Sequence, residues 1–182
     1  MKIVMFGMPA AGKGTQSQLL AKLYQIPHIS PGEIFRNEMA NETELGKKID
    51  KVMKSGGLVD DDTTIEILKP HLKKDFILDG FPRNKYQAEW FDSFCETEDI
   101  TIDAYILLDI NEEVSRKRIV KRSQEINRPE DANEVSLKTR YDTFYTDTIQ
   151  AIDHFERRLI KLIGTMDIRV IYTLIKGLVN GR

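Results

Sequence analysis

Short runs of apolar residues alternate along the chain with longer segments in which apolar residues recur at helical spacing. In the first of these longer segments, for example, Leu19, Leu20 and Leu23 fall on one face of a helix. The short runs are bounded by charged residues or glycine, which is typical of strands that are covered on both faces in a parallel sheet. The predicted strands are Ile3–Phe6, Phe76–Leu78, Ala104–Asp109 and Leu159–Ile163.

Helical segments separate these strands, so the pattern predicts an α/β chain. In an open parallel sheet, ligands bind at the carboxyl ends of the strands, and the residues directly after each strand are therefore the first candidates for a functional site. The predicted helices are Thr15–Tyr24, Gly32–Asn41, Glu44–Ser55, Thr63–Leu72, Tyr86–Phe94, Glu112–Arg122, Asn133–Arg158 and Asp167–Val179.

The composition narrows the class of protein. At about one domain per ~150 residues, the chain of 182 residues, 41% hydrophobic and 31% charged, is long enough for one globular domain with a real core. The net charge of -2 gives no electrostatic reason to expect binding to nucleic acid or to an anionic membrane. No stretch approaches the ~20 apolar residues of a membrane span. Cys95 is the only cysteine, which excludes a disulfide and a cysteine zinc site within one chain and favours a cytoplasmic location.

The loop after the first strand carries the clearest chemistry, and it reads Gly7-Met8-Pro9-Ala10-Ala11-Gly12-Lys13-Gly14-Thr15. Between a strand and a helix, a glycine-rich loop allows successive backbone N–H groups to converge on phosphate oxygens. Lys13 can then reach the terminal phosphates, and Thr15 stands near a metal ion. The alternative, a glycine-rich turn with a surface lysine, is disfavoured by this strand, loop and helix context.

This loop, with a glycine directly after Lys13, resembles the phosphate loop of the adenylate kinase branch of the nucleoside monophosphate kinases. Further segments resemble landmarks of that family in the same order, and the resemblance extends from Lys2 to about Val170. Those segments are Ile29–Arg36, Glu44–Gly46, Gly56–Val59, and Leu78–Arg83 followed by Gln87.

The resemblance implies a three-layer α/β/α fold of the P-loop NTPase type around a central five-stranded parallel sheet. It implies a single kinase domain with a core of residues 1–29, 60–121 and 134–182, a helical monophosphate-binding insertion of residues 30–59 and a short lid of residues 122–133. A lid of this length leaves no room for a zinc site, and we expect it to close over bound nucleotides and exclude water. The family's usual form is a monomer.

The implied reaction is the reversible transfer of the γ-phosphoryl group of Mg-ATP to AMP, giving two ADP, for adenine nucleotide homeostasis. Phosphoryl transfer requires the protein mainly to position the nucleotides and to neutralise charge, so a lysine and several arginines should converge. For each arginine alone, the alternative is a solvated helix face. The resemblance implies catalytic roles for Lys13, Arg83, Arg118, Arg122, Arg128 and Arg140.

Each nucleotide has its own implied contacts. Asp79 ends a strand, where its carboxylate can reach magnesium through water, although such a residue can also cap a turn. Gln87 offers both a donor and an acceptor, which suits an adenine edge, although simple solvent exposure is the alternative. The implied ATP contacts are Ala10, Ala11, Gly12, Lys13, Gly14, Thr15, Arg118, Arg122 and Met166. The implied AMP contacts are Pro31, Arg36, Gly57, Leu58, Val59, Gly80, Phe81, Pro82, Arg83, Gln87, Arg128 and Arg140.

Two other functions remain open. A kinase of the same architecture that accepts UMP or CMP is favoured by Pro31, which replaces the family's usual threonine, and by Asn84, whereas Gln87 argues against it. A nucleotide-binding protein without turnover is the other possibility, and the retention of Lys13 and the arginines argues against it. Ala10 is a further departure, because it replaces the family's usual glycine and lacks that residue's freedom to adopt positive φ.

Overall fold

The computed structural model describes residues 1–125, 131 and 133–181, and its centre is a five-stranded parallel sheet in the order β2-β3-β1-β4-β5. This sheet confirms the predicted fold class. Four strands match the predicted ones to within a residue, whereas β2 contains only two residues and was not predicted. The strands are β1 (Lys2–Phe6), β2 (His28–Ile29), β3 (Phe76–Asp79), β4 (Ala104–Asp109) and β5 (Leu159–Ile163).

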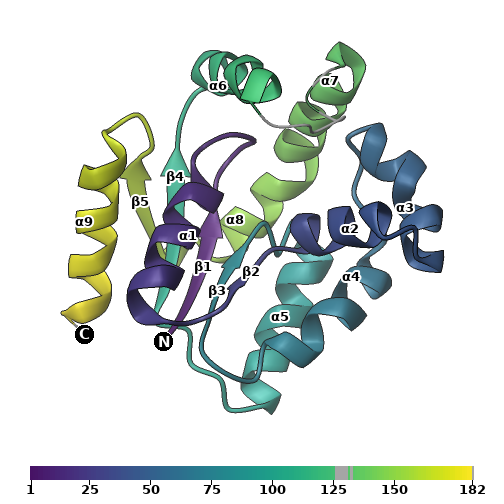
Figure 1. Ribbon diagram of the computed structural model, residues 1–182. Helices are drawn as coiled ribbons and strands as arrows, with labels where there is room; N and C mark the ends of the chain where they lie inside the picture. The colour runs from purple at the N-terminus through teal and green to yellow at the C-terminus, as the bar shows by residue number, and fades with distance from the viewer. Residues whose placement is uncertain (126–130, 132, 182) are drawn as a thin grey trace.

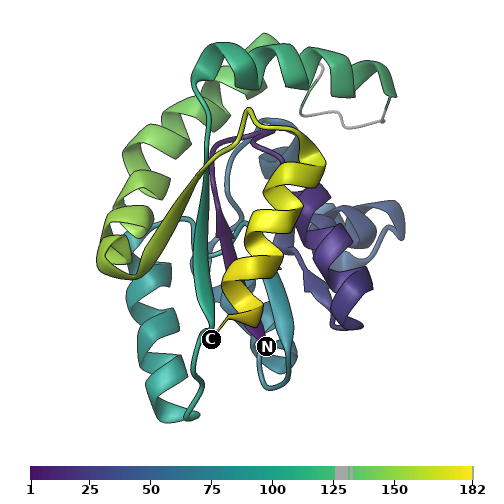
Figure 2. The same ribbon diagram turned by 90° about the vertical axis from the view of Figure 1, so that its left-hand side faces the viewer.

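Helices cover both faces of the sheet (Figure 1 and Figure 2). On one face α1 (Lys13–Tyr24) packs beside α9 (Ile168–Asn180), and on the other α5 (Lys85–Thr97) packs beside α8 (Ile149–His154). Because both faces are covered, Ile3, Val4 and Met5 of the central strand β1 are fully buried.

Further helices lie beyond the carboxyl ends of the strands and to one side of the sheet (Figure 1). α6 (Glu112–Glu125) and α7 (Glu134–Thr143) lie above the carboxyl ends. α2 (Pro31–Ala40), α3 (Glu44–Lys54) and α4 (Asp61–Leu68) lie on the side of β2. Among the described residues, no helix is both long and apolar enough to cross a membrane.

Two predicted helices differ most from the structure. The segment predicted as Asn133–Arg158 is divided into α7, a π-helical turn η3 (Phe144–Thr148), α8 and a 3-10 turn η4 (Glu156–Arg158). The segment predicted as Thr63–Leu72 begins earlier, because the carboxylate of Asp60 accepts the backbone N–H of Thr63 and caps α4. It ends at Leu68 and gives way to the 3-10 turn η1 (Lys69–His71), where Pro70 cannot continue an α-helix.

Candidate active site

The phosphate loop connects β1 to α1 and lies at the carboxyl end of the central strand. A Cβ at Gly7 would lie 2.7 Å from the carbonyl oxygen of Leu108, so glycine is required there. Gly12 has a φ of 103°, and Ala10 has a φ of 56°. Alanine therefore adopts the left-handed conformation at a position where the family usually has glycine, at a cost of about 1–2 kcal/mol.

Lys13 is partly buried at the start of α1, and its ammonium group folds back over the loop. Nζ donates hydrogen bonds to the carbonyl oxygens of Gly7 at 2.8 Å and Met8 at 3.1 Å. Burial has the largest effect on the pKa of Lys13, Asp79 opposes the shift and the positive charge of Arg83 adds to it, so that the pKa is lowered to about 8. A buried ammonium with a depressed pKa favours a negatively charged ligand, which would restore the protonated form.

Asp79 ends β3 beside the phosphate loop, and its side chain is 12% exposed. Burial alone would raise the pKa of Asp79, but the neighbouring His28 imidazole and the charges of Lys13 and Arg83 outweigh burial, so the pKa lies below its usual value. The carboxylate is therefore ionised at neutral pH. The nearest ring nitrogen, Nε2 of His28, lies 3.6 Å from Oδ2, and this buried nitrogen has no hydrogen-bond partner among the described residues.

Arg83 follows the turn after β3 and is held on two sides. Its Nε donates to the carbonyl oxygen of Gly80 at 2.9 Å, and its own carbonyl oxygen accepts the hydroxyl of Thr148 at 3.1 Å. Burial lowers the pKa of Arg83, and the nearby Arg140 and Arg36 lower it further, while Asp79 raises it. Three guanidinium groups are thus concentrated in one place, which suits the binding of a polyanion.

Asp131 joins Arg122 to Arg140, and sequence reasoning did not include it among the site residues. Its buried carboxylate accepts from Nε and Nη2 of Arg122 at 2.7 and 2.8 Å, and from Nη1 of Arg140 at 2.5 Å. Burial would raise the pKa of Asp131, but these two arginines lower it overall. An acidic residue between two helix-borne arginines gives no local signal in a sequence, because the contact depends on how α6 and α7 approach each other.

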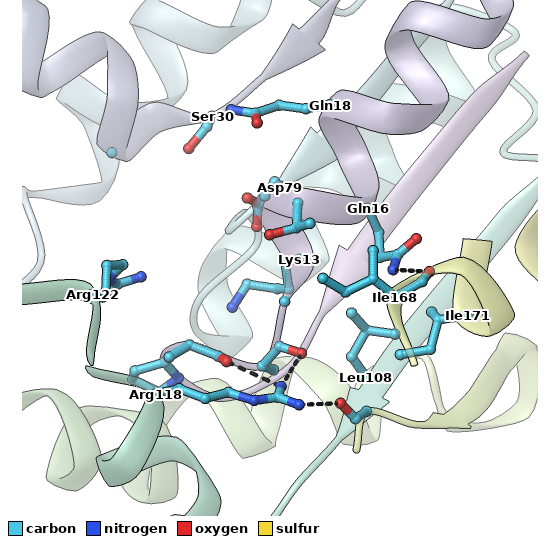
Figure 3. A pocket seen from close by; sticks show the side chains of 18 of the residues that line it. Lys13, Gln16, Gln18, Ser30, Asp79, Leu108, Arg118, Arg122, Ile168 and Ile171 are labelled. Carbon is cyan, nitrogen blue, oxygen red and sulfur yellow. Dashed lines mark hydrogen bonds between the residues drawn. The ribbon is translucent and has the colours of Figure 1, made fainter. Parts of the chain in front are cut away.

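Arg118 contacts backbone carbonyl groups on two loops (Figure 3). Its Nη1 donates to the carbonyl oxygens of Ala10 at 3.4 Å and Ala11 at 3.2 Å, and its Nη2 donates to that of Gly164 at 2.8 Å. Its guanidinium group therefore joins the phosphate loop to the loop between β5 and α9, close to where a donor nucleotide would lie.

Ser115, one turn earlier on α6, also contacts the phosphate loop and was not predicted. Its buried hydroxyl donates to the carbonyl oxygen of Pro9 at 2.6 Å and shares a hydrogen bond of 2.8 Å with the hydroxyl of Tyr141. Because Pro9 accepts the Ser115 proton, Tyr141 is the donor in the second bond. This relay connects the phosphate loop to both α6 and α7.

Two cavities meet at the carboxyl ends of the strands, one of about 490 Å³ and one of about 110 Å³. The larger is lined by every predicted ATP contact, together with Asp79. The smaller is lined by the predicted AMP contacts except Phe81 and Pro82, which are buried and do not line it, and Arg128, which lies outside the described residues. Gly32, Arg36, Arg83 and Arg140 line both cavities.

The strand, phosphate loop and helix, with an ionised aspartate and converging arginines beside them, define a P-loop phosphotransferase. Comparison with known proteins narrows this class. The family model described as adenylate kinase matches residues 5–160, and the chain belongs to this family of nucleoside monophosphate kinases.

Relatives in several bacteria share most of the chain's length. The adenylate kinase of Corynebacterium urealyticum is 35% identical over 167 residues, covering 89% of this chain and 90% of the relative. That of Oenococcus oeni is 36% identical over 187 aligned positions, covering 98% and 97% of the two chains. That of Clostridium kluyveri is 40% identical over 165 residues, covering 86% and 76%.

Proposed function

We propose that this chain transfers the γ-phosphoryl group of Mg-ATP to AMP and interconverts ATP plus AMP with two ADP. The observation that carries the proposal is the wall of Arg36, Arg83 and Arg140 that the two cavities share. In-line transfer requires a donor and an acceptor phosphate to meet in one place where positive charge neutralises the group in motion. The relatives named above are adenylate kinases, which supports adenine in both cavities.

The larger cavity suits the donor. At about 490 Å³ it falls within the usual range of small-molecule sites. The backbone N–H groups of the phosphate loop and the start of α1 would bind the phosphates, and Lys13 would leave the loop carbonyls to reach them. Arg118 and Arg122 would face the donor phosphates from α6, and Met166 would lie beside the donor base.

Magnesium fits the side chains beside the loop. Among the described residues there is no group of three or more potential metal-ligating side chains, so a metal held entirely by protein is not supported. Magnesium, however, commonly uses one or two carboxylates with phosphates and water. Asp79, buried and ionised, would hold it through water with the Thr15 hydroxyl nearby. Bound magnesium would neutralise charge on the donor phosphates.

The smaller cavity suits the acceptor. Arg36 and Arg83 would bind its phosphate, and Arg140 would face the transferring group together with Arg128. The segment Gly57–Val59 and the side chain of Gln87 would contact the base. Asn84, which favoured a pyrimidine acceptor, does not line this cavity, because its amide caps α5 and contacts Asp61. Pro31 does line it, and thus remains the one feature that favours UMP or CMP.

We further propose that residues 30–59 form an insertion distinct from the core and that residues 122–133, of which 126–130 and 132 lie outside the described residues, form the short lid. A small cluster of Phe35, Ile49 and Val59, separate from the main core, supports the first of these. We also propose that the enzyme is a cytoplasmic monomer, in line with its single cysteine and the family's usual form.

The test is initial-rate phosphoryl transfer from Mg-ATP to AMP, CMP, UMP, GMP and dAMP in parallel, with Lys13→Met as the control. A strong preference for AMP is expected. Preference for a pyrimidine would move the assignment to the UMP or CMP kinases, and the absence of transfer to any acceptor would leave a nucleotide-binding protein without turnover.

A further inference from the structure

Asp61, the first residue of α4, holds two side-chain amides with one oxygen. Its Oδ1 accepts a hydrogen bond of 2.7 Å from Nε2 of Gln87 and one of 2.8 Å from Nδ2 of Asn84. Helix α4 follows the segment that lines the smaller cavity and lies against α5, which carries Gln87 (Figure 1). Asp61 therefore connects the base-binding segment to the side chain that is proposed to contact the base.

The amide of Gln87 is held from both sides. Its Oε1 accepts a hydrogen bond of 2.7 Å from the backbone N–H of Arg83, opposite the bond from Nε2 to Asp61. Gln87 is 1% exposed as a residue, so water cannot replace either partner. A flipped amide would place Oε1 against the carboxylate and Nε2 against the N–H of Arg83. Both contacts would then join like groups, and two buried polar groups would lose their partners.

We propose that Asp61 is a positioning residue that sets the acceptor's base specificity by holding the Gln87 amide in one orientation. This inference rests on the proposed function, because it assumes that the base of the acceptor lies in the smaller cavity. An acceptor-only carboxylate on one side and a donor-only N–H on the other together determine which end of the amide is the donor.

The fixed amide selects a class of base. Nε2 retains a second hydrogen and Oε1 a second lone pair, so the amide offers a donor beside an acceptor. A ring nitrogen that accepts, next to an amino group that donates, complements this edge, and adenine has that pattern at N1 and N6. A base with a ring N–H next to a carbonyl, as in IMP and GMP, requires the flipped amide, which Asp61 and Arg83 oppose.

The test compares AMP with IMP, which differ only at this edge of the purine. Asp61→Asn keeps the size of the side chain, but asparagine can donate as well as accept, so on this side either orientation of Gln87 finds a partner and only the N–H of Arg83 still opposes the flip. We expect the ratio of kcat/KM for AMP to that for IMP to fall by about tenfold or more, within the usual discrimination of a bidentate base contact. The KM for ATP should not change.

Two control variants separate this role from a purely structural one. Asp62→Asn makes the same charge change one residue later, at an exposed position, and should leave the AMP to IMP ratio unchanged. Asn84→Ala removes the α5 cap and the second amide on Asp61, so it should lower the melting temperature without changing that ratio. If Asp61→Asn does not unfold cooperatively on heating, Asp61→Ser, which can also donate and accept, replaces it.

An unchanged AMP to IMP ratio in a folded Asp61→Asn variant would overturn the inference, as would an equal fall in Asn84→Ala. The proposed function fails in a different way, which is that the unmodified enzyme does not use AMP at all. The two failures are therefore distinguished by the measurement on the unmodified enzyme.

Discussion

Two clusters of charged side chains lie at opposite ends of the parallel sheet, and they differ in their balance of charge. At the carboxyl ends of the strands, cations outnumber carboxylates among the described residues that line the two cavities. Lys13 and Arg83, both partly buried, each have a pKa lowered mainly by burial, and neighbouring cations add to that shift against the opposing charge of Asp79. The folded chain thus holds an excess of positive charge in a cavity that is large enough for a nucleotide.

At the amino ends, the guanidinium of Arg158 is paired with a carboxylate that also binds a histidine. Asp92 of α5 accepts from Nε2 of His154 at 2.6 Å and from both terminal nitrogens of Arg158 at 3.0 and 2.7 Å. The guanidinium of Arg158 also lies over the rings of Tyr105 and Phe155, at 5.1 and 4.8 Å from their centroids. Burial would raise the pKa of Asp92, but its hydrogen bonds to Arg158 and His154 lower it overall.

The difference in charge balance indicates which of the two clusters acts on a ligand. Charges that are balanced within the fold stabilise it, whereas an excess of one sign near a cavity costs stability and is compensated only when a ligand of opposite charge binds. Removing a charge should therefore affect activity at one end of the sheet and stability at the other.

The largest expected effect is at Lys13. Lys13→Met should keep the fold and reduce turnover by about 10³–10⁵, the range found for cations that stabilise phosphoryl transfer. Initial rates with Mg-ATP and AMP, together with a thermal melt, test this. Near-normal turnover in the folded variant would contradict the conclusion that the cluster at this end of the sheet acts on a ligand.

At the other end, Asp92→Ala should lower the free energy of unfolding by about 1–2 kcal/mol, because it leaves His154 and Arg158 without their shared acceptor. The melting temperature should fall by about 2–6 °C, and turnover should remain at the level of the unmodified enzyme. Asp153→Ala, at an exposed acid beside His154, is the matched control and should leave the melting temperature nearly unchanged. Loss of turnover in Asp92→Ala would mean that the two ends are coupled.

Pro31→Thr sharpens the comparison within the site, because Pro31 lines only the smaller cavity. The added hydroxyl and backbone N–H should change the KM for AMP by about threefold to tenfold, the size of one modest hydrogen bond. The KM for ATP should stay the same. If neither value changes, the smaller cavity is not where the acceptor base binds.

The smallest expected effect is the uptake of a fraction of a proton when a nucleotide binds. With a pKa of about 8, Lys13 is only partly protonated at pH 8.5. Bound phosphates would raise that pKa, so nucleotide binding should take up protons between pH 8 and 10, and affinity should fall as pH rises through this window. Calorimetry of ATP binding in two buffers of different ionisation enthalpy measures the uptake. Uptake that persists in Lys13→Met would assign it to another group.

The sequence predicted the sheet, and it named most of the residues that are proposed as nucleotide contacts and that line the two cavities, because both depend on local patterns. Runs of apolar residues indicate the buried strands, and the glycines together with Lys13 indicate the phosphate loop. Strand β2 was not predicted, because a strand of two residues shows no periodicity in the sequence. The roles of Asp61, Asp131 and Ser115 were not predicted for a different reason. Each role depends on contacts between segments that only the folded chain brings together, so no local sequence pattern indicates it.

The wall of Arg36, Arg83 and Arg140 has a consequence for how the two substrates influence each other. Two polyanions that bind side by side repel, and a shared positive wall offsets that repulsion for both. Reducing its charge by one should therefore introduce negative cooperativity, so that each nucleotide binds more weakly when the other is present. Thermodynamic linkage requires this penalty to be equal in both directions, whichever substrate binds first.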